Sequence, residues 1–297
     1  MEYDIVILGS GPAGLTAALY AARAGKSTMV LGGNELGGQT ATIAKLENYP
    51  GFMGSGLELA EKMRDQAKMF GATIKMTSAQ SVKTHGESFS VITTGGDEYI
   101  ARAVIIATGA SPRKMQITGV REFFGRGVSY CATCDGFFYT DKDVLVIGGG
   151  NSALNDALYL ANIARSVKII YRRDTFSRAE KILSDRVNDT KNISVLWNTE
   201  LTEVGGDASG VTFAKTSNME QIECDGVFIA IGHEANTDFL GEEYKRDNMG
   251  RIIAGDLPRG IFVAGDVRAG IKMQVATAVG TGCDTAMDAI AYLNSVK

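Results

Sequence analysis

The sequence predicts an α/β protein made of two similar three-layer units, with the second unit inserted into the first. Three observations support this prediction. An apolar run, a glycine-rich turn and an apolar helical pattern follow one another twice, starting at Tyr3 and at Asp143. Each copy is later closed by a second buried-strand pattern that ends in glycine, at 103–109 and 226–232. The chain after Gly232 is too short for a third unit, so we expect it to complete the first.

The first unit is expected to comprise residues 1–115 and 240–297. Its first strand and glycine-rich turn lead into a helix that runs through Arg23. Apolar residues at a spacing of three or four then predict a helix over 57–70, which ends near Gly71. The remaining elements expected in this unit are short strands at 73–76, 88–93 and 260–264 and a final helix at 274–293.

The second unit is expected at residues 116–239. Its first strand and glycine-rich turn are followed by a helix and by a further strand at 167–171. A β-rich stretch then contains two apolar runs, at 193–196 and 211–214. We interpret the glycines between these runs as turns of a small meander, at Gly205, Gly206 and Gly210.

The composition is that of a globular protein and excludes several classes of partner. The chain has 297 residues, of which 45% are hydrophobic and 22% charged, with a net charge of −4. Because lysine and arginine form no long run, we expect no nucleic-acid or membrane partner. No apolar stretch approaches the ~18 residues that span a bilayer. The acidic start at Met1–Asp4 is unlike a basic secretion signal, so we expect a cytoplasmic protein.

The two glycine-rich turns have the pattern of dinucleotide-binding, Rossmann-like units. The first glycine permits a tight turn, the second lets the backbone approach a pyrophosphate, and the third packs helix on strand. The free N–H groups of the helix N-terminus then face the negative charge. The positions concerned are Gly9, Gly11 and Gly14 in the first copy and Gly148, Gly150 and Ala153 in the second.

The residues that follow the two turns predict different dinucleotides. In the second copy the strand at 167–171 is followed by Arg172 and Arg173, with Arg178 close by. Arginine at this place accommodates the 2′-phosphate of NADP, although a solvated charge cluster is the alternative. The first copy lacks the acid that normally follows about 20 residues later. We therefore expect NADPH in the second unit and FAD in the first, where a flavin receives hydride from a nicotinamide.

Cys131 and Cys134 form a close pair that is typical of redox or metal chemistry. Zinc needs four ligands, and the other cysteines, Cys224 and Cys283, stand singly, so we favour a redox disulfide and expect no metal. One thiol of such a pair commonly ionises near neutral pH and attacks a partner disulfide. Asp135 is the candidate for proton transfer, with a helix N-cap as the alternative. We expect Cys224 and Cys283 to be small buried side chains.

Seven motifs together resemble the low-molecular-weight thioredoxin reductases, which are FAD-dependent pyridine nucleotide-disulfide oxidoreductases. The resemblance covers essentially the whole chain, and its most specific part is the cysteine block at Ser129–Phe138. The other motifs, in chain order, are Gly9–Gly14, Glu47–Gly51, Ala107–Gly109, Gly148–Ala153, Arg172–Arg173 and Gly265–Val267.

The resemblance implies a homodimer that passes electrons from NADPH through FAD and the Cys131–Cys134 disulfide to oxidised thioredoxin or a thioredoxin-like protein. It implies that Cys134 lies against the flavin, that Cys131 attacks the partner, and that Asp135 is the acid. The FAD-binding residues that it implies are Gly9, Gly11, Pro12, Ala13, Gly14, Gly38, Gln39, Asn48, Thr108, Gly109, Gly265, Asp266, Gln274 and Val275. The NADPH-binding residues that it implies are Gly148, Gly150, Asn151, Ser152, Ala153, Arg172, Arg173 and Arg178.

The chain departs from the family pattern near the expected nicotinamide site. Tyr171 stands where the family usually has His, Asn151 where it has Asp, and Met273 where it has Arg, and Ser177 is inserted before Arg178. These departures keep two other electron donors open, NADH and a reduced deazaflavin. A nucleotide-binding redox sensor without turnover is the alternative from another functional class.

Overall fold

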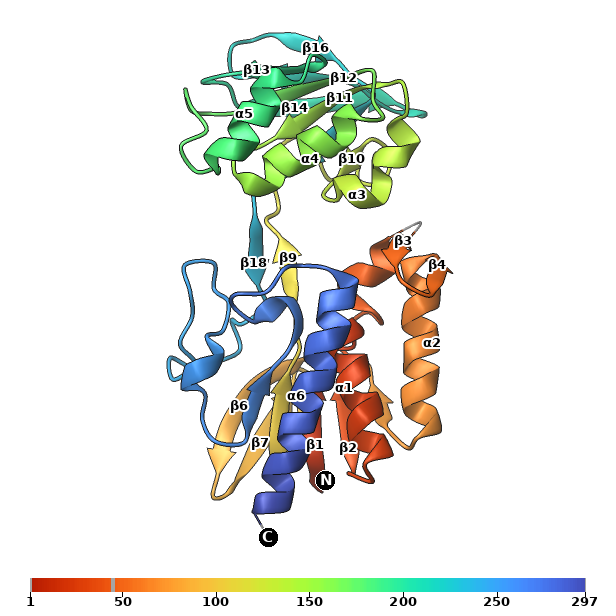
Figure 1. The fold of residues 1–297 in the computed structure, drawn as a ribbon, viewed down its shortest axis with the longest axis vertical. Coiled ribbons are helices and arrows are strands. Elements are labelled where there is room, and N and C mark those ends of the chain that lie inside the picture. The colour runs from red at the N-terminus through yellow and green to blue at the C-terminus, as the bar shows by residue number, and fades with distance from the viewer. Residues whose placement is uncertain (1, 44–45, 297) are drawn as a thin grey trace. The chain divides into compact units, whose positions relative to one another are not determined.

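The structure is a computed structural model that describes residues 2–43 and 46–296 (Figure 1). The chain divides into two compact units. Unit 1 comprises Met1–Ser111 and Glu234–Lys297, and unit 2 comprises Pro112–His233. The chain passes between the units at the short strands β9 (Ala110–Pro112) and β18 (His233–Ala235), which pair with each other. Unit 2 is therefore inserted into unit 1 along the sequence, and the protein has the α/β class that the sequence predicts.

Unit 1 is built on a seven-stranded sheet with the order β5-β2-β1-β8-β7-β6, with β19 also paired to β8. The strands β5, β2, β1, β8 and β19 run parallel, whereas β6 and β7 form an antiparallel hairpin on β8. The bounds are β1 Glu2–Leu8, β2 Thr28–Leu31, β5 Thr73–Lys75, β6 Ala79–His85, β7 Ser88–Thr93, β8 Glu98–Ile106 and β19 Ile261–Val263.

Three helices and several small elements complete unit 1. Figure 1 shows α1 (Pro12–Arg23) and α6 (Val275–Ser295) side by side over the sheet. The helix α2 (Gly56–Met69) is capped by Ser55, whose hydroxyl accepts the N–H of Glu58 at 3.1 Å. The small elements are η1 Gly38–Thr42, β3 Leu46–Tyr49, β4 Phe52–Gly54, η3 Ala254–Asp256 and η4 Gly265–Val267.

The core of unit 1 follows the alternation of side chains along β1. Ile5 and Ile7 are fully buried under the alanine-rich faces of α1 and α6. Val6 and Leu8 point to the other face, where they join an apolar cluster that includes Leu240 from the loop after β18. Each such side chain contributes about 1.5–3 kcal/mol when it leaves water. The sheet is buried on both faces at Ile5–Leu8, which explains why this part of β1 is an uninterrupted apolar run.

Unit 2 contains a five-stranded parallel sheet with the order β10-β17-β11-β12-β13 and a three-stranded antiparallel sheet, β14-β15-β16. The parallel strands are β10 Val128–Ser129, β11 Asp143–Ile147, β12 Ser166–Ile170, β13 Ile193–Leu196 and β17 Gly226–Ile229. The antiparallel strands are β14 Leu201–Asp207, β15 Gly210–Thr216 and β16 Gln221–Glu223. The helical elements are α3 Ala132–Asp135, η2 Gly136–Tyr139, α4 Asn151–Ala161 and α5 Lys181–Asp189.

The expected meander of unit 2 needs correction. β13 (Ile193–Leu196) is the edge of the parallel sheet and does not belong to the meander. Gly205 and Gly206 lie inside β14 and not in a turn. A Cβ atom at Gly205 would overlap the ring of Phe213 on the neighbouring strand, so the glycine serves close strand packing at an irregular register.

Within residues 2–43 and 46–296, no helix has both the length and the apolar character needed to cross a membrane.

Candidate functional site

The first glycine-rich turn of unit 1 is shaped by close backbone contacts. Gly9 has φ +111°, and a Cβ atom there would overlap the carbonyl oxygen of Ala107. A Cβ atom at Gly14 would overlap the carbonyl oxygen of Gly9, so only glycine brings α1 this close to the turn. Gly11 is the N-cap of α1, and no described side chain caps the helix. The first N–H groups of α1, which starts with Pro12 and Ala13, remain available for an anion such as a pyrophosphate.

Asp266 lies beside this turn and has a buried carboxylate oxygen. Its Oδ1 atom has no hydrogen-bond partner among the described residues. Burial raises the pKa of Asp266 to about 6. A Cβ atom at Gly265, which has φ +73°, would lie 2.8 Å from the side chain of Ala13. The acid therefore stands next to the N-terminus of α1, where it fits a ligand that carries hydroxyl donors.

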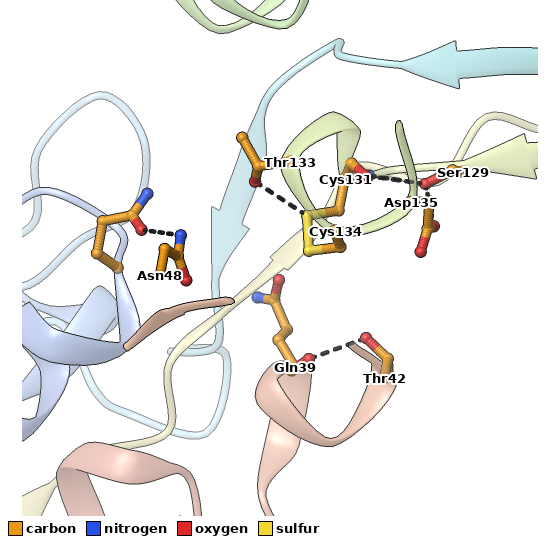
Figure 2. Close-up of a disulfide and its surroundings, with 9 residues drawn as sticks. Gln39, Thr42, Asn48, Ser129, Cys131, Thr133, Cys134 and Asp135 are labelled. Carbon is orange, nitrogen blue, oxygen red and sulfur yellow. Dashed lines mark hydrogen bonds between the residues drawn. A yellow bond between two sulfur atoms is a disulfide. The ribbon is translucent and has the colours of Figure 1, made fainter. Parts of the chain in front are cut away.

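The other FAD candidates lie on loops of the same unit. Gly38 and Gln39 are the first two residues of η1. The preceding residue, Gly37, donates its N–H to the carbonyl of Ser10 at 3.0 Å, and this bond joins η1 to the first glycine-rich turn. Thr108 and Asn236 exchange two hydrogen bonds of 2.7 and 2.8 Å beside Gly109. The Nδ2 atom of Asn48 donates to Oε1 of Gln274 at 3.4 Å (Figure 2), and Val275 then begins α6. The structure thus gathers these segments around one end of the parallel strands.

The residues present fit FAD. An uncapped helix N-terminus behind three glycines suits the pyrophosphate, and the unpartnered oxygen of Asp266 suits a ribityl hydroxyl.

The second glycine-rich turn repeats this geometry in unit 2. Gly148 has φ +140°, and a Cβ atom there would overlap the carbonyl oxygen of Ala230. Gly150 is the N-cap of α4, without a side-chain cap from the described residues. In the first turn of α4, Ser152 is exposed and Ala153 is fully buried. Another helix N-terminus is therefore open to an anion.

The loop after β12 is fastened to this second turn. Nδ2 of Asn151 donates to Oε1 of Glu180 at 2.9 Å, and the N–H of Glu180 donates to Oδ1 of Asn151 at 2.7 Å. A backbone bridge joins Gly150 to Arg178. The ring of Tyr171 covers Gly149, where a Cβ atom would lie 2.5 Å from ring carbons. Glu180 was not predicted from the sequence, and its place at the start of a helix is the only local signal for it.

Three arginines, Arg172, Arg173 and Arg178, stand on this loop. Arg172 and Arg178 are exposed and Arg173 is half-buried. Over the described ranges, no carboxylate forms an ion pair with any of them. Three unpaired guanidinium groups close to a helix N-terminus suit a phosphate group.

Cys131 and Cys134 are joined by a disulfide across the first turn of α3, with their Cα atoms 5.3 Å apart (Figure 2). Both residues are half-buried, and the hydroxyl of Thr133 lies 3.6 Å from Sγ of Cys131. Among the described residues, no cluster of histidine, cysteine and acidic side chains has the arrangement of a metal site. The pair is therefore a candidate for thiol–disulfide exchange.

Asp135 ends α3, and its carboxylate turns toward β10. The Oγ atom of Ser129 donates to Oδ2 of Asp135 at 2.6 Å. Burial raises the pKa of Asp135, and the hydrogen bond from Ser129 opposes that rise. Asp135 also stands at the N-cap position of η2, as the alternative interpretation of the sequence expects, but its side chain makes no capping hydrogen bond there. Ser129 was not singled out from the sequence, because nothing local distinguishes its hydroxyl from others.

The two remaining cysteines differ from each other. Cys224 is buried, and burial raises the pKa of its thiol to about 12. Cys283 is only half-buried on α6, with its sulfur 4.0 Å from that of Met287, so the expectation of a buried side chain is wrong for this residue.

Residues 3–282 match the family described as pyridine nucleotide-disulphide oxidoreductase. The chain is 43% identical to a thioredoxin reductase of Rickettsia conorii, over 98% of each chain. It is 45% identical to a thioredoxin reductase of Treponema pallidum, over 100% of this chain and 99% of the other. The crystal structure of thioredoxin reductase from Streptococcus pyogenes superposes with a TM-score of 0.87 at 38% identity, over 99% of each chain. The chain therefore belongs to the pyridine nucleotide-disulphide oxidoreductases and, within them, to the low-molecular-weight thioredoxin reductases.

Proposed function

We propose that this protein is an NADPH-dependent thioredoxin-disulfide reductase. In this proposal electrons pass from NADPH through FAD and the Cys131–Cys134 disulfide to oxidised thioredoxin or a thioredoxin-like protein. The observation that carries the proposal is the disulfide across the first turn of α3, in a chain of this family, with Asp135 at the end of the same helix.

FAD would be held by the residues of unit 1. The first turn of α1, behind Gly9, Gly11 and Gly14, would bind the pyrophosphate, and Asp266 would accept a ribityl hydroxyl. When bound, FAD supplies two-electron transfer between a nicotinamide and a disulfide. The buried Oδ1 atom of Asp266 would gain the hydrogen bond that it lacks among the described residues.

The cysteine pair would complete the reaction by two exchanges. The thiolate of Cys131 attacks one sulfur of the partner's disulfide, so a mixed disulfide forms and the partner's other sulfur leaves as a thiolate. The thiolate of Cys134 then attacks Sγ of Cys131, which restores the Cys131–Cys134 bond and releases the partner's second thiolate. The partner gains two electrons and two protons, and Asp135 would exchange a proton in these steps.

NADPH is the donor that the unpaired arginines favour. Arg172, Arg173 and Arg178 offer positive charge for a 2′-phosphate, which NADH lacks. Tyr171, packed on Gly149, and the shifted place of Arg178 are departures from the family pattern, so NADH and a reduced deazaflavin remain the donors to be compared.

The donor is tested by anaerobic mixing of the oxidised protein with NADPH, NADH or reduced deazaflavin, while the visible absorption of the flavin is followed. We expect NADPH to bleach the flavin fastest. A flavin that responds to the deazaflavin alone would refute the choice of donor and leave the disulfide chemistry intact.

The reductase activity is tested by NADPH oxidation in the presence of oxidised thioredoxin. Cys131→Ser and Cys134→Ser should each abolish disulfide reduction and leave a yellow, FAD-loaded protein. Cys283→Ser, which removes a thiol outside the pair, should retain full turnover. Protein that binds both nucleotides without steady turnover would instead indicate a redox sensor.

The proposal includes a homodimer that acts in the cytoplasm. Light scattering of the purified protein should give twice the mass of the chain, and a single-chain mass would refute the dimer. Fractionation of cells that express the protein tests the compartment.

A further inference from the structure

Ser129 is a buried hydroxyl that joins both functional groups of the cysteine segment. It is the last residue of β10, pairs with Phe228 of β17 and is only 3% exposed. Its Oγ atom accepts the N–H of Cys131 at 3.0 Å and donates to Oδ2 of Asp135 at 2.6 Å. The carbonyl oxygen of Cys131 is a longer alternative acceptor, at 3.4 Å. A single hydroxyl proton cannot serve both acceptors well, so the shorter contact to Asp135 is the principal bond.

These contacts form a closed ring of hydrogen bonds around the start of α3. Cys131 donates through its N–H to Ser129, Ser129 donates to the carboxylate of Asp135, and the N–H of Asp135 donates to the carbonyl of Cys131 at 3.1 Å. Figure 2 shows Ser129, Cys131 and Asp135 in this arrangement beside the disulfide. The ring fixes the carboxylate relative to the backbone of Cys131, and β10 anchors it to the parallel sheet.

We propose that Ser129 is a positioning residue for thiol–disulfide exchange, which holds the carboxylate of Asp135 in place at the end of α3, directly after Cys134 in the chain. The proposal deepens the proposed function, because it assigns the residue that controls the acid of the same site. Ser129 touches neither sulfur in the described contacts, so it acts through the carboxylate of Asp135.

The expected effect follows from the electrostatics of Asp135. Burial raises the pKa of this carboxyl and the bond from Ser129 lowers it, and no charged neighbour contributes to the shift. Two titratable groups on the elements packed against α3 must be considered. Tyr139 on η2 has a pKa raised to about 12 by burial and stays neutral. Asp156 on α4 has a pKa raised to about 7 by burial, so its titration must be separated from that of Asp135.

The first test is the pH dependence of alkylation at Cys131. Protein reduced with dithiothreitol is reacted with iodoacetamide between about pH 5 and 9, and the modification at Cys131 is quantified by fragment mass spectrometry. This measurement requires neither NADPH nor thioredoxin. In Ser129→Ala we expect the inflection that arises from Asp135 to move up by about one pH unit, because the hydrogen bond that lowers the pKa of this carboxyl is lost.

Matched variants separate positioning from a merely structural role. Ser129→Thr keeps the hydroxyl and should restore the profile. Thr140→Ala removes a hydroxyl that donates to the carbonyl of Phe137 in the same segment, and it should leave the profile unchanged. Asp156→Asn should remove the inflection that Asp156 contributes to the alkylation profile, and the shift caused by Ser129→Ala should remain.

A double-mutant cycle with Asp135→Asn decides the route of the effect. If Ser129 acts through the carboxyl, Ser129→Ala should add no further change to the profile of Asp135→Asn. In the loaded enzyme, Ser129→Ala should shift the pH profile of kcat and leave KM for thioredoxin unchanged.

Coincident alkylation profiles for wild type and Ser129→Ala, or additive effects in the cycle, would overturn the inference. Should Ser129→Ala not fold, Ser129→Gly removes the same hydroxyl. If the wild type does not reduce thioredoxin, that result counts against the proposed function alone, because the alkylation profile does not depend on thioredoxin reduction.

Discussion

The buried Oδ1 atom of Asp266, which has no hydrogen-bond partner among the described residues, gives a prediction about stability. The perturbation is Asp266→Asn in protein stripped of FAD, which preserves the size of the side chain and removes its charge. Burial raises the pKa of Asp266 from 3.8 to about 6. A shift of about two units, at about 1.4 kcal/mol per unit, corresponds to about 3 kcal/mol between the two protonation states.

The sign of the effect follows from the raised pKa. Below about pH 4 the carboxyl of Asp266 is protonated in both folded and unfolded chains, so it does not lower the free energy of unfolding. Between about pH 4 and pH 6 the carboxyl ionises in the unfolded chain and stays protonated in the folded one, so the free energy of unfolding falls, and above about pH 6 this loss is complete. At about pH 8 the Asn variant should therefore be more stable than the wild type by about 3 kcal/mol, whereas near pH 4 the two should be equal.

The assay is urea unfolding of the apoprotein at several values between about pH 4 and 8. Far-ultraviolet circular dichroism follows both units, and the fluorescence of Trp197, the only tryptophan of the chain, follows unit 2 as an internal control. The Trp197 transition should be the same in both proteins. Parallel curves of unfolding free energy against pH for wild type and variant would refute the reasoning.

Three further predictions concern other described residues. Gly14→Ala should abolish FAD binding, measured by flavin absorbance, because the new Cβ atom overlaps the backbone of the turn; Gly280→Ala in α6, where a Cβ atom meets nothing within 4 Å, should retain the flavin. Cys224 should resist Ellman's reagent at pH 8 in the folded protein, because burial raises the pKa of its thiol to about 12, and rapid labelling before unfolding would contradict this. Glu180→Ala should weaken NADPH binding several-fold in titration calorimetry, because Asn151 loses the hydrogen bond from its Nδ2 atom to the carboxylate and keeps only the one from the backbone N–H of residue 180; unchanged affinity would show that the carboxylate contact is irrelevant to the nucleotide.

Helices, strands and turns could be predicted from the sequence where the local residue pattern and the tertiary fold favour the same structure. The helix expected over 57–70 is α2 (Gly56–Met69), because apolar spacing and the Ser55 cap act within one turn of the chain. The strand expected at 88–93 is β7 (Ser88–Thr93). Both glycine-rich turns are where expected, because only glycine tolerates the backbone overlaps found there.

The remainder depends on tertiary contacts that no local pattern reveals. β6 (Ala79–His85) was not predicted, since only Val82 in it is buried and its strand form depends on pairing with β7. The ring that joins Ser129 to Asp135 likewise arises because β10 ends beside α3, which the spacing of the two residues does not reveal.

The insertion of unit 2 sets an order of events during synthesis on the ribosome. Residues 112–233 are contiguous, so unit 2 has all its strands as soon as β17 has emerged. Unit 1 must wait, because β19 and α6 come from the last part of the chain and cover β8 and α1. Asp266 is synthesised between β19 and α6. The nascent protein therefore contains the Cys131–Cys134 pair before it can complete the flavin-binding residues of unit 1.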